Sequence, residues 1–342
     1  MQERRRKEKP LKKLIVTFVL GVCALSMSRA QSSSGPPRPG DIFYLDWGDA
    51  INGAYVVKFV PGAGPPGIIS SHLNSPEAIA VDRNGQIIVA SYSSIIRIEP
   101  MSGTREVIAD LGKFGGVWGI ALAPDGDIFA TFIGGRYAGH RRYYFPDCEK
   151  EPKFKLSSGI VQIAPTTGKI KAMSSRHSFQ YPIGVALAES GDLFVVNVAF
   201  PSEIVRISSK RGTEKVVSKG DYLHFPLGIT VSGQYAYVTD VATEDQNFGI
   251  GAVVRVDIDT GAQTVLTSGN NLLKPVGIAM DLNGQLIVTD PYTINHSGGD
   301  LYDGGIIRID PVSGLQTLLA HGHDNIINPT AVTVVRDIKG SQ

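Results

Sequence analysis

The 342-residue sequence predicts an all-β fold of repeated four-stranded antiparallel units, and two observations lead to that prediction. One short apolar motif recurs along the chain, and a turn carrying glycine follows its first five copies. The six copies lie at residues 76–81, 117–122, 182–187, 226–231, 275–280 and 329–334. Four short strands per unit, repeated at roughly 40 to 55 residues, are typical of a propeller blade. The predicted architecture is a six-bladed β-propeller.

The strands of each unit can be placed by their turns. The motif forms the first strand, and a turn such as Asn84-Gly85 or Asn283-Gly284 connects it to a second apolar strand. A third strand recurs, for example at residues 95–98 and 306–309, and a further glycine turn precedes the fourth. Asn-Gly turns between β-branched strands favour antiparallel hairpins. The small residue at the third motif position indicates that the first strands converge on the axis, where backbones approach closely.

The sixth unit is split between the two ends of the chain. Residues 331–335 supply its inner strand, whereas residues 40–46, 55–59 and 67–70 supply the other three. Pairing the two ends within one blade closes the ring and removes the exposed sheet edge of an open array. We therefore expect the propeller to span residues 40–338.

The first thirty residues are predicted to be a secretory signal peptide rather than part of the fold. A basic leader (residues 4–13) precedes an apolar run (residues 14–25), and Ser28-Arg29-Ala30 offers small residues before a cut at Gln31. The alternative is an uncleaved membrane anchor, but the apolar run is short for a span of about 20 residues. Residues 31–39 are rich in Ser, Pro and Gly and are predicted to be a flexible lead-in.

These features predict an exported protein, periplasmic or secreted, with no membrane attachment after cleavage. Only Cys148 remains in the mature chain, so no internal disulfide is expected. The formal net charge is +1, and outside one local stretch the mature sequence lacks the clustered Lys and Arg that nucleic-acid binding requires, so no nucleic-acid partner is expected. A local stretch at residues 135–155 interleaves basic and aromatic residues, including Arg141 and Tyr143. It could clamp an anionic ligand over the channel or pack as a lid on the propeller.

The strand order shows which strand ends and loops share each of the two faces of the propeller. The start of each first strand and the end of each second strand share a face, as does the loop from the second to the third strand. The long insertions, at residues 132–158, 242–251 and 291–304, all fall in that loop. The last of them contains His296. Long loops on one face of a rigid scaffold usually carry function.

Polar residues recur at the ends of the second strands on this face. They are Asp46, Ser91, Phe132 (the apolar exception), Asn197, Asp240 and Asp290. At the second position of the first strands, Glu77 interrupts an apolar column that contains Trp118. Oxygen ligands from several blades suit Ca²⁺ or Mg²⁺, so we expect a metal at Glu77, Asn197, Asp240 and Asp290. Alternatively, the aspartates cap backbone N–H groups of the next turn, and a salt bridge satisfies Glu77.

The repeats also resemble known families. Pro275-Val-Gly-Ile-Ala, Asn283-Gly284, Val288-Thr-Asp290 and Ile306-Ile-Arg-Ile-Asp310 together resemble an NHL-type repeat. The pattern is equally similar to the propellers of the gluconolactonase (senescence-marker) family and of virginiamycin B lyase.

The resemblance implies the fold over the whole mature chain, and it also implies candidate site residues. Likeness to the gluconolactonases implies that Glu77, Asn197 and Asp240 form the site, with Glu77 and Asp240 catalytic. Glu77 follows Pro76, whereas the glutamate of that family usually precedes the proline. Likeness to the lyase implies a histidine near an inner-strand start, and His224 is the match.

Two functions follow as hypotheses. The first is a metal-dependent hydrolase of lactones or esters, or a lyase, in which the cation polarises a carbonyl or stabilises an enolate. The second is a non-catalytic propeller that binds a small molecule, a glycan or a protein with the same face. In both cases the expected ligand-binding residues are Trp118, Arg141, Tyr143, His224 and His296. No Gly-x-Ser-x-Gly, His-Glu-x-x-His or Cys-x-x-Cys motif occurs, so serine-nucleophile and zinc-thiolate chemistry are unsupported.

Overall fold

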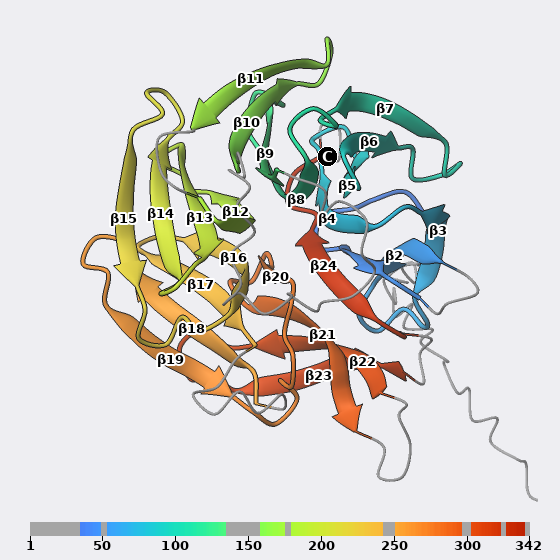
Figure 1. The fold of residues 1–342 in the computed structure, drawn as a ribbon. Helices are drawn as coiled ribbons and strands as arrows, with labels where there is room; N and C mark the ends of the chain where they lie inside the picture. The colour runs from blue at the N-terminus through green and yellow to red at the C-terminus, as the bar shows by residue number, and fades with distance from the viewer. Residues whose placement is uncertain are drawn as a thin grey trace, which may run out of the picture. The chain divides into compact units, whose positions relative to one another are not determined.

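The structure is a computed structural model, and it describes residues 35–48, 53–134, 158–174, 179–241, 250–295, 302–322 and 326–338. All of these belong to the larger of two compact units, Gln31–Gln342, the other being Met1–Ala30. The described residues form six four-stranded antiparallel sheets and no α-helix. The sheets follow one another around a ring (Figure 1), so the predicted six-bladed β-propeller is confirmed.

Each blade runs from an inner strand at the axis to an outer strand at the rim. Blade 1 contains β4 (Pro76–Val81), β5 (Ile87–Ser91), β6 (Ser94–Ile98) and β7 (Arg105–Asp110). Blade 2 contains β8 (Gly116–Leu122), β9 (Ile128–Ile133), β10 (Gly159–Ala164) and β11 (Lys169–Ser174). Blade 3 contains β12 (Tyr181–Leu187), β13 (Asp192–Val198), β14 (Glu203–Ser208) and β15 (Glu214–Lys219).

The remaining blades repeat this order, and the last one joins the two ends of the chain. Blade 4 contains β16 (Pro226–Ser232), β17 (Tyr235–Asp240), β18 (Ala252–Asp257) and β19 (Gln263–Ser268). Blade 5 contains β20 (Ile278–Met280), β21 (Leu286–Asn295), β22 (Tyr302–Ile309) and β23 (Gln316–His321). Blade 6 contains β24 (Pro329–Val334), β1 (Ile42–Asp46), β2 (Ala54–Phe59) and β3 (Gly67–Leu73), in that order.

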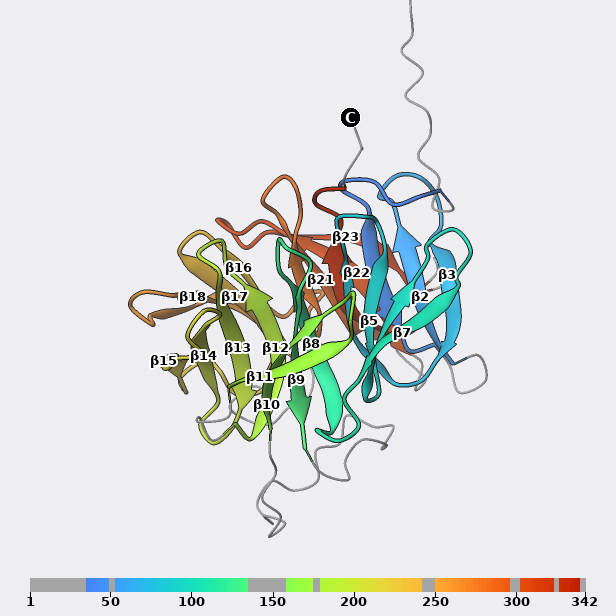
Figure 2. The same ribbon diagram turned by 90° about the horizontal axis from the view of Figure 1, so that it is seen from above.

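The closure of the ring is as predicted. β24 pairs antiparallel with β1, with Ile42 opposite Val334 and Tyr44 opposite Val332. Reciprocal bonds between Gly40, Asp41 and Val335 extend the pairing beyond the strand ends. Figure 2 shows the same ribbon turned by 90°, with the strands of successive blades seen from above.

The core lies between the blades. Six clusters of buried aliphatic and aromatic side chains occur among the described residues, and each joins two neighbouring blades. The cluster around Phe194, Val238 and Leu227, for example, fills the space between blades 3 and 4. Each sheet therefore buries both faces against its neighbours, because no blade has a hydrophobic core of its own.

Threonine side chains connect inner strands across three of the blade interfaces. Thr239 Oγ1 accepts a bond from Gly228 N in its own blade (2.8 Å) and donates to Val276 O in the next blade (2.8 Å). Thr131 and Thr289 make the equivalent pairs of bonds. The accepting carbonyl lies where a Cβ on Gly228 would clash with it. The glycine and the threonine together therefore set the approach of one blade to the next.

A second set of contacts joins the outer strands. The first residue of an outer strand bonds back to the outer strand of the preceding blade, as Gln263 Nε2 does with Ser218 Oγ (2.9 Å). Gln316 reaches Thr267 in the same way (3.0 Å). At the closing interface, Arg105 of β7 donates to Ser70 Oγ (3.0 Å) and to the carbonyls of Ser71 and His72 in β3. These bonds join neighbouring blades at the rim, whereas the threonines join them near the axis.

A buried ion pair fixes the start of the propeller. Lys58 Nζ lies 2.8 Å from Asp41 Oδ2, and both side chains are 2% exposed. The same ammonium donates to Gly35 O (2.9 Å) and Pro36 O (3.0 Å). The described part of the lead-in, from residue 35 onward, is thereby held against blade 6.

Replacing Thr239 by valine should lower the free energy of unfolding by about 1–3 kcal/mol, because Gly228 N and Val276 O would lose a buried partner at nearly unchanged side-chain volume. Urea unfolding at neutral pH measures the change. Thr264→Val, at an exposed position of β19, is the matched control and should shift the value by less than about 0.5 kcal/mol. Equal effects of the two substitutions would show that the inter-blade bridge does not stabilise the ring.

Candidate functional site

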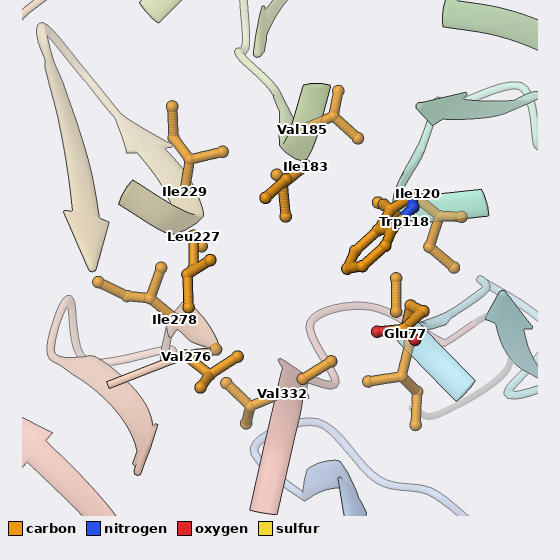
Figure 3. Close-up of a pocket in the computed structure, with 17 residues that line it drawn as sticks. Glu77, Trp118, Ile120, Ile183, Val185, Leu227, Ile229, Val276, Ile278 and Val332 are labelled. Carbon is orange, nitrogen blue, oxygen red and sulfur yellow. The ribbon is translucent and has the colours of Figure 1, made fainter. Parts of the chain in front are cut away.

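The inner strands enclose a cavity of about 130 Å³ on the axis. Its lining comes from the inner strands of all six blades, and aliphatic side chains such as Ile183, Leu227 and Val276 make up most of it (Figure 3). Among the described lining residues, Glu77 is the one charged side chain, and the Trp118 indole lies beside it on the neighbouring strand. The structure thus brings together Glu77 and Trp118, two of the residues that the sequence singled out.

Local backbone geometry directs Glu77 into this cavity. Pro76 pairs with Ser91 and Ala78 pairs with Ala90, so Glu77 is the extra residue of a β-bulge. Bulges redirect side chains and interrupt pairing at the rims of sheets. Trp47, just after β1, donates from Nε1 to Pro76 O (2.9 Å) and so fixes the residue before Glu77. The position of the carboxyl therefore depends on a side chain from blade 6 as well as on its own strand.

The surroundings of Glu77 disfavour its charged form. Its side chain is half-buried among apolar walls, and this desolvation raises the pKa of the Glu77 carboxyl well above its ordinary value. Within the described part of the chain, no hydrogen bond or ion pair to the Glu77 side chain is present. A carboxyl in this setting is either protonated or completed by a partner that brings positive charge.

The other polar residue of the apolar column points elsewhere. Thr330, at the position in blade 6 that corresponds to Glu77, is 1% exposed and lies 3.4 Å from Leu45 O, to which it donates. It is absent from the lining of the cavity at Glu77. Glu77 is consequently the single acidic interruption of the column.

The polar residues at the second-strand ends bind backbone amides. Asp240 accepts from His224 N (2.9 Å) and Phe225 N (3.1 Å). Asp46 accepts from Ile327 N and Asn328 N at 3.0 Å each, which joins the chain ends again. Each carboxylate therefore caps the segment that leads into the inner strand of its own blade, the alternative role considered from the sequence.

Asn197 and Asp290 follow the same scheme. Asn197 Oδ1 accepts from Gln180 N (3.1 Å), and its Nδ2 donates to Glu203 Oε1 (2.9 Å). Asp290 accepts from Leu273 N and Lys274 N at 2.7 Å. Burial raises the pKa of Asp290 to about 6, against the opposing effect of these amide donors.

These capping residues do not extend the Glu77 site. Asn197, Asp240 and Asp290 are at most 1% exposed, and none of them lines the cavity at Glu77. No group of three or more His, Cys, Asp or Glu side chains in the described ranges is placed to hold a metal ion. These ranges bring no such group together at Glu77, Asn197, Asp240 and Asp290, and metal binding by the chain stays a prediction.

The predicted ligand-binding residues divide into three groups. Trp118 lines the cavity. His224 is half-buried two residues before β16, and its backbone N–H donates to Asp240. Arg141, Tyr143 and His296 lie outside the described residues. Of the five, Trp118 is thus the one that the structure places beside Glu77.

The cavity opens onto a face with exposed aromatic residues that sequence reasoning did not single out. Phe200 (74% exposed), Tyr222 (49%) and Tyr92 (38%) lie in loops at the end of the blades where the inner strands begin. Ile250 and Ile327 are exposed in loops at the same end. One sequence signal existed: each of the three aromatic residues falls in a short connection rather than in a strand.

The opposite end of the channel is wider. A cavity of about 630 Å³ lies there, between the turns that follow the inner strands. Six aliphatic residues line both cavities, one from each blade: Ile79, Ile120, Val185, Ile229, Ile278 and Val332. This ring marks the boundary between the Glu77 site and the wider opening. The described ranges contain no helix long and apolar enough to cross a membrane.

No protein-family model and no curated protein sequence matches the chain. Solved structures do resemble it. TolB from Acinetobacter baumannii matches with a TM-score of 0.61 and 17% identity, over 86% of this chain and 66% of that one, so the chain spans about two thirds of the TolB length. A chain of a nidogen/laminin complex matches with a TM-score of 0.62 and 14% identity, over 87% and 99%.

A putative TolB from Agrobacterium tumefaciens matches with a TM-score of 0.58 and 11% identity, over 86% of this chain and 91% of that one. These structures are six-bladed β-propellers, and at such identities the likeness shows the fold alone. They do not confirm the narrower resemblance to NHL or gluconolactonase propellers.

Replacing Glu77 by glutamine should stabilise the protein at pH 8 and leave it unchanged near pH 4. The folded-state pKa of Glu77 is raised, so wild-type stability falls as the pH rises from the ordinary glutamate value through that raised pKa. Glutamine has no proton to lose and escapes this penalty. Thermal unfolding of both proteins from pH 4 to 8 measures the difference. Glu189→Gln, at an exposed turn, is the control. If the stability advantage of Glu77→Gln over the wild type shrinks with rising pH, the raised pKa of Glu77 is contradicted.

Replacing Asp240 by alanine should lower the free energy of unfolding by about 1–3 kcal/mol, because two backbone N–H groups lose their acceptor. If Asp240 acts as a cap, Ca²⁺, Mg²⁺ or a chelator should leave the unfolding temperature of the wild type unchanged. Differential scanning fluorimetry with each addition measures this. A rise with Ca²⁺ that disappears in Asp240→Ala would instead restore Asp240 as a metal ligand.

Proposed function

We propose that the chain is an exported, non-catalytic binding propeller whose aromatic-bearing face binds a protein partner. The observation that carries the proposal is the set of exposed residues in loops at the end of the blades where the inner strands begin, namely Tyr92, Phe200, Tyr222, Ile250 and Ile327. Exposed aromatic side chains are the residues that most often dominate protein interfaces. The Glu77 cavity, whose walls are apolar and which holds one carboxyl, is lined by the first residues of the inner strands that begin at this face.

The hydrogen bonds of the predicted catalytic residues support binding over catalysis. A general acid or base must come within hydrogen-bond reach of its substrate. Asp240 is 1% exposed and its carboxylate already accepts from two backbone N–H groups. Asn197 is fully buried and bonded to Glu203. Of the expected catalytic pair, Glu77 lines the axial cavity and Asp240 does not. The hydrolase and lyase hypotheses therefore gain no second group among the described residues.

The comparisons are consistent with a binding role but do not specify it. One similar chain comes from a structure of a nidogen/laminin complex, so a propeller of this type occurs in a protein assembly. For the present chain we take from this only a reason to test protein partners before small molecules or glycans. The export proposal rests separately on the basic, apolar and small-residue order of residues 4–30.

A random peptide library displayed on phage provides the test. Peptides selected on the purified protein should bind through the aromatic face, so Phe200→Ser and Tyr222→Ser should each weaken them about 5- to 30-fold, as interface aromatics usually do. Fluorescence anisotropy of labelled peptides measures the affinities. Val312→Ser and Leu315→Ser remove exposed apolar residues from the turn between β22 and β23 at the other end of the blades and serve as controls.

The proposal fails if the selection enriches no specific peptide. It also fails if the control substitutions weaken binding as much as the aromatic ones do, because the binding face would then be the opposite one.

A further inference from the structure

We infer that the Glu77 cavity is a subsite for one aliphatic ammonium group, such as the end of a lysine side chain, with Glu77 as counter-ion and Trp118 as aromatic wall. The inference rests on the proposed function, because it assigns the chemistry of the residue that a partner inserts at the centre of the binding face. It names a site of defined size, shape and charge.

The size of the cavity selects a single side chain. Its volume is about 130 Å³, whereas pockets for drug-sized ligands are about 300–1,000 Å³. At about 30 Å³ for each water of liquid volume, it holds the equivalent of only a few waters. A folded glycan or a nucleotide therefore exceeds it, but an unbranched side chain does not.

The walls match an alkyl chain. Ile183, Leu227 and Val276 line the cavity on three successive blades, and they form the column that Glu77 and Trp118 complete. Lysine buries its methylene groups along apolar surface and keeps its charged end in a polar environment. In this cavity the polar environment for that end is the Glu77 carboxyl.

Charge selects a cation over an anion or a neutral group. Glu77 is the one charged residue in the described lining, and no described side chain pairs with it. A carboxylate among apolar walls is costly unless an opposite charge completes it. An incoming ammonium supplies that charge, while an anion would add a second negative charge to the same space.

Trp118 adds a second attraction for the same group. Its indole lies on β8 beside Glu77 on β4, and both side chains point into the cavity (Figure 3). A cation over an indole face is stabilised by the ring quadrupole, and tryptophan is the strongest of the aromatic partners. A carboxylate and an indole on adjacent strands can therefore contact one ammonium from two sides.

The site is held in place before a ligand arrives. Trp47 fixes Pro76 through its 2.9 Å bond. Thr131 accepts from Gly119 N, directly after Trp118, and donates to Ile183 O across the blade interface. Two bonds between blades and one within blade 2 thus fix the backbone beside Glu77, Trp118 and Ile183, which lowers the entropy cost of binding.

Binding should be coupled to loss of a proton. Burial raises the pKa of Glu77, so the empty site holds a proton that an entering ammonium displaces into solvent. The groups that face Glu77 from the other inner strands are Trp118, Ile183, Leu227, Val276 and Val332, none of which titrates. Among the described lining residues Glu77 is thus the one that titrates, and affinity for an ammonium should rise with pH through its titration, because an alkylammonium keeps its charge below a pH of about 10.

Titration with n-pentylammonium, followed by the indole N–H signals in ¹H–¹⁵N spectra, tests the inference. The chain has two tryptophans, and the signal lost in Trp118→Leu identifies that of the cavity. Pentylammonium should shift this signal and bind at least 10-fold more tightly than the neutral 1-pentanol, the anionic pentanoate or pentylguanidinium. Its affinity should rise from pH 5 to pH 8.

Substitutions separate the contributions of Glu77 and Trp118 to pentylammonium binding. Glu77→Gln should weaken pentylammonium binding at least 10-fold at pH 8 and abolish its dependence on pH. Trp118→Leu should weaken it roughly 2- to 30-fold, measured from the backbone amide signals because the Trp118 indole signal is absent. Glu189→Gln should have no effect. Binding of pentanol or pentanoate as tight as that of pentylammonium, or unchanged binding in Glu77→Gln, overturns the inference. Tighter binding of pentylguanidinium than of pentylammonium overturns the assignment of the subsite to a lysine side chain.

The failures of the two proposals are distinguishable. Selected peptides that bind through Phe200 and Tyr222 but are unaffected by Glu77→Gln would overturn the ammonium subsite and leave the binding function standing. Pentylammonium binding at Glu77 without any selected peptide would support the subsite and overturn the protein-binding function.

Discussion

The hydroxyl bridge between inner strands is the interaction on which the arrangement of the propeller depends. Thr131, Thr239 and Thr289 each bond a glycine N–H in their own blade and a carbonyl in the next one. The bridge requires a residue without Cβ at the glycine, since the next blade's carbonyl occupies that space. The inner strands consequently converge closely, and the small volume of the Glu77 cavity follows from that convergence.

Much of the fold could be predicted because its signals are local. Asn84-Gly85 and Asn283-Gly284 specify their turns by backbone conformation, with the glycines at φ values of +77° and +75°. The split blade could be predicted as well, since the C-terminal motif lacked partner strands that the N-terminal segment supplied. The function of the threonines could not, because Thr239 bonds Val276, a residue in another blade. Such a contact exists only after the blades are assembled.

The candidate site was predicted less completely, because the sequence does not show the direction in which each side chain points. Glu77 and Trp118 were recognised as irregular members of an apolar column, and they do meet in the cavity. For Asp240 and Asp290, the common strand position left two roles open, metal binding and capping of backbone N–H groups. A strand-end carboxylate is equally well placed for the amides that lead into the neighbouring inner strand, and the hydrogen bonds take that course. Residue spacing gives the face of the propeller but not the orientation of each oxygen.

The buried Lys58 ammonium has a consequence for where the folded domain begins. Of its three oxygen acceptors, one belongs to Asp41 in the first residues of the propeller, and the other two are the carbonyls of Gly35 and Pro36. A shortened chain starting at Asp41 would keep every strand and yet leave an interior charge with a single acceptor. The domain therefore extends upstream of its first strand to residue 35 at least, because a proline-rich segment that resembles a linker supplies two carbonyl acceptors for a buried charge.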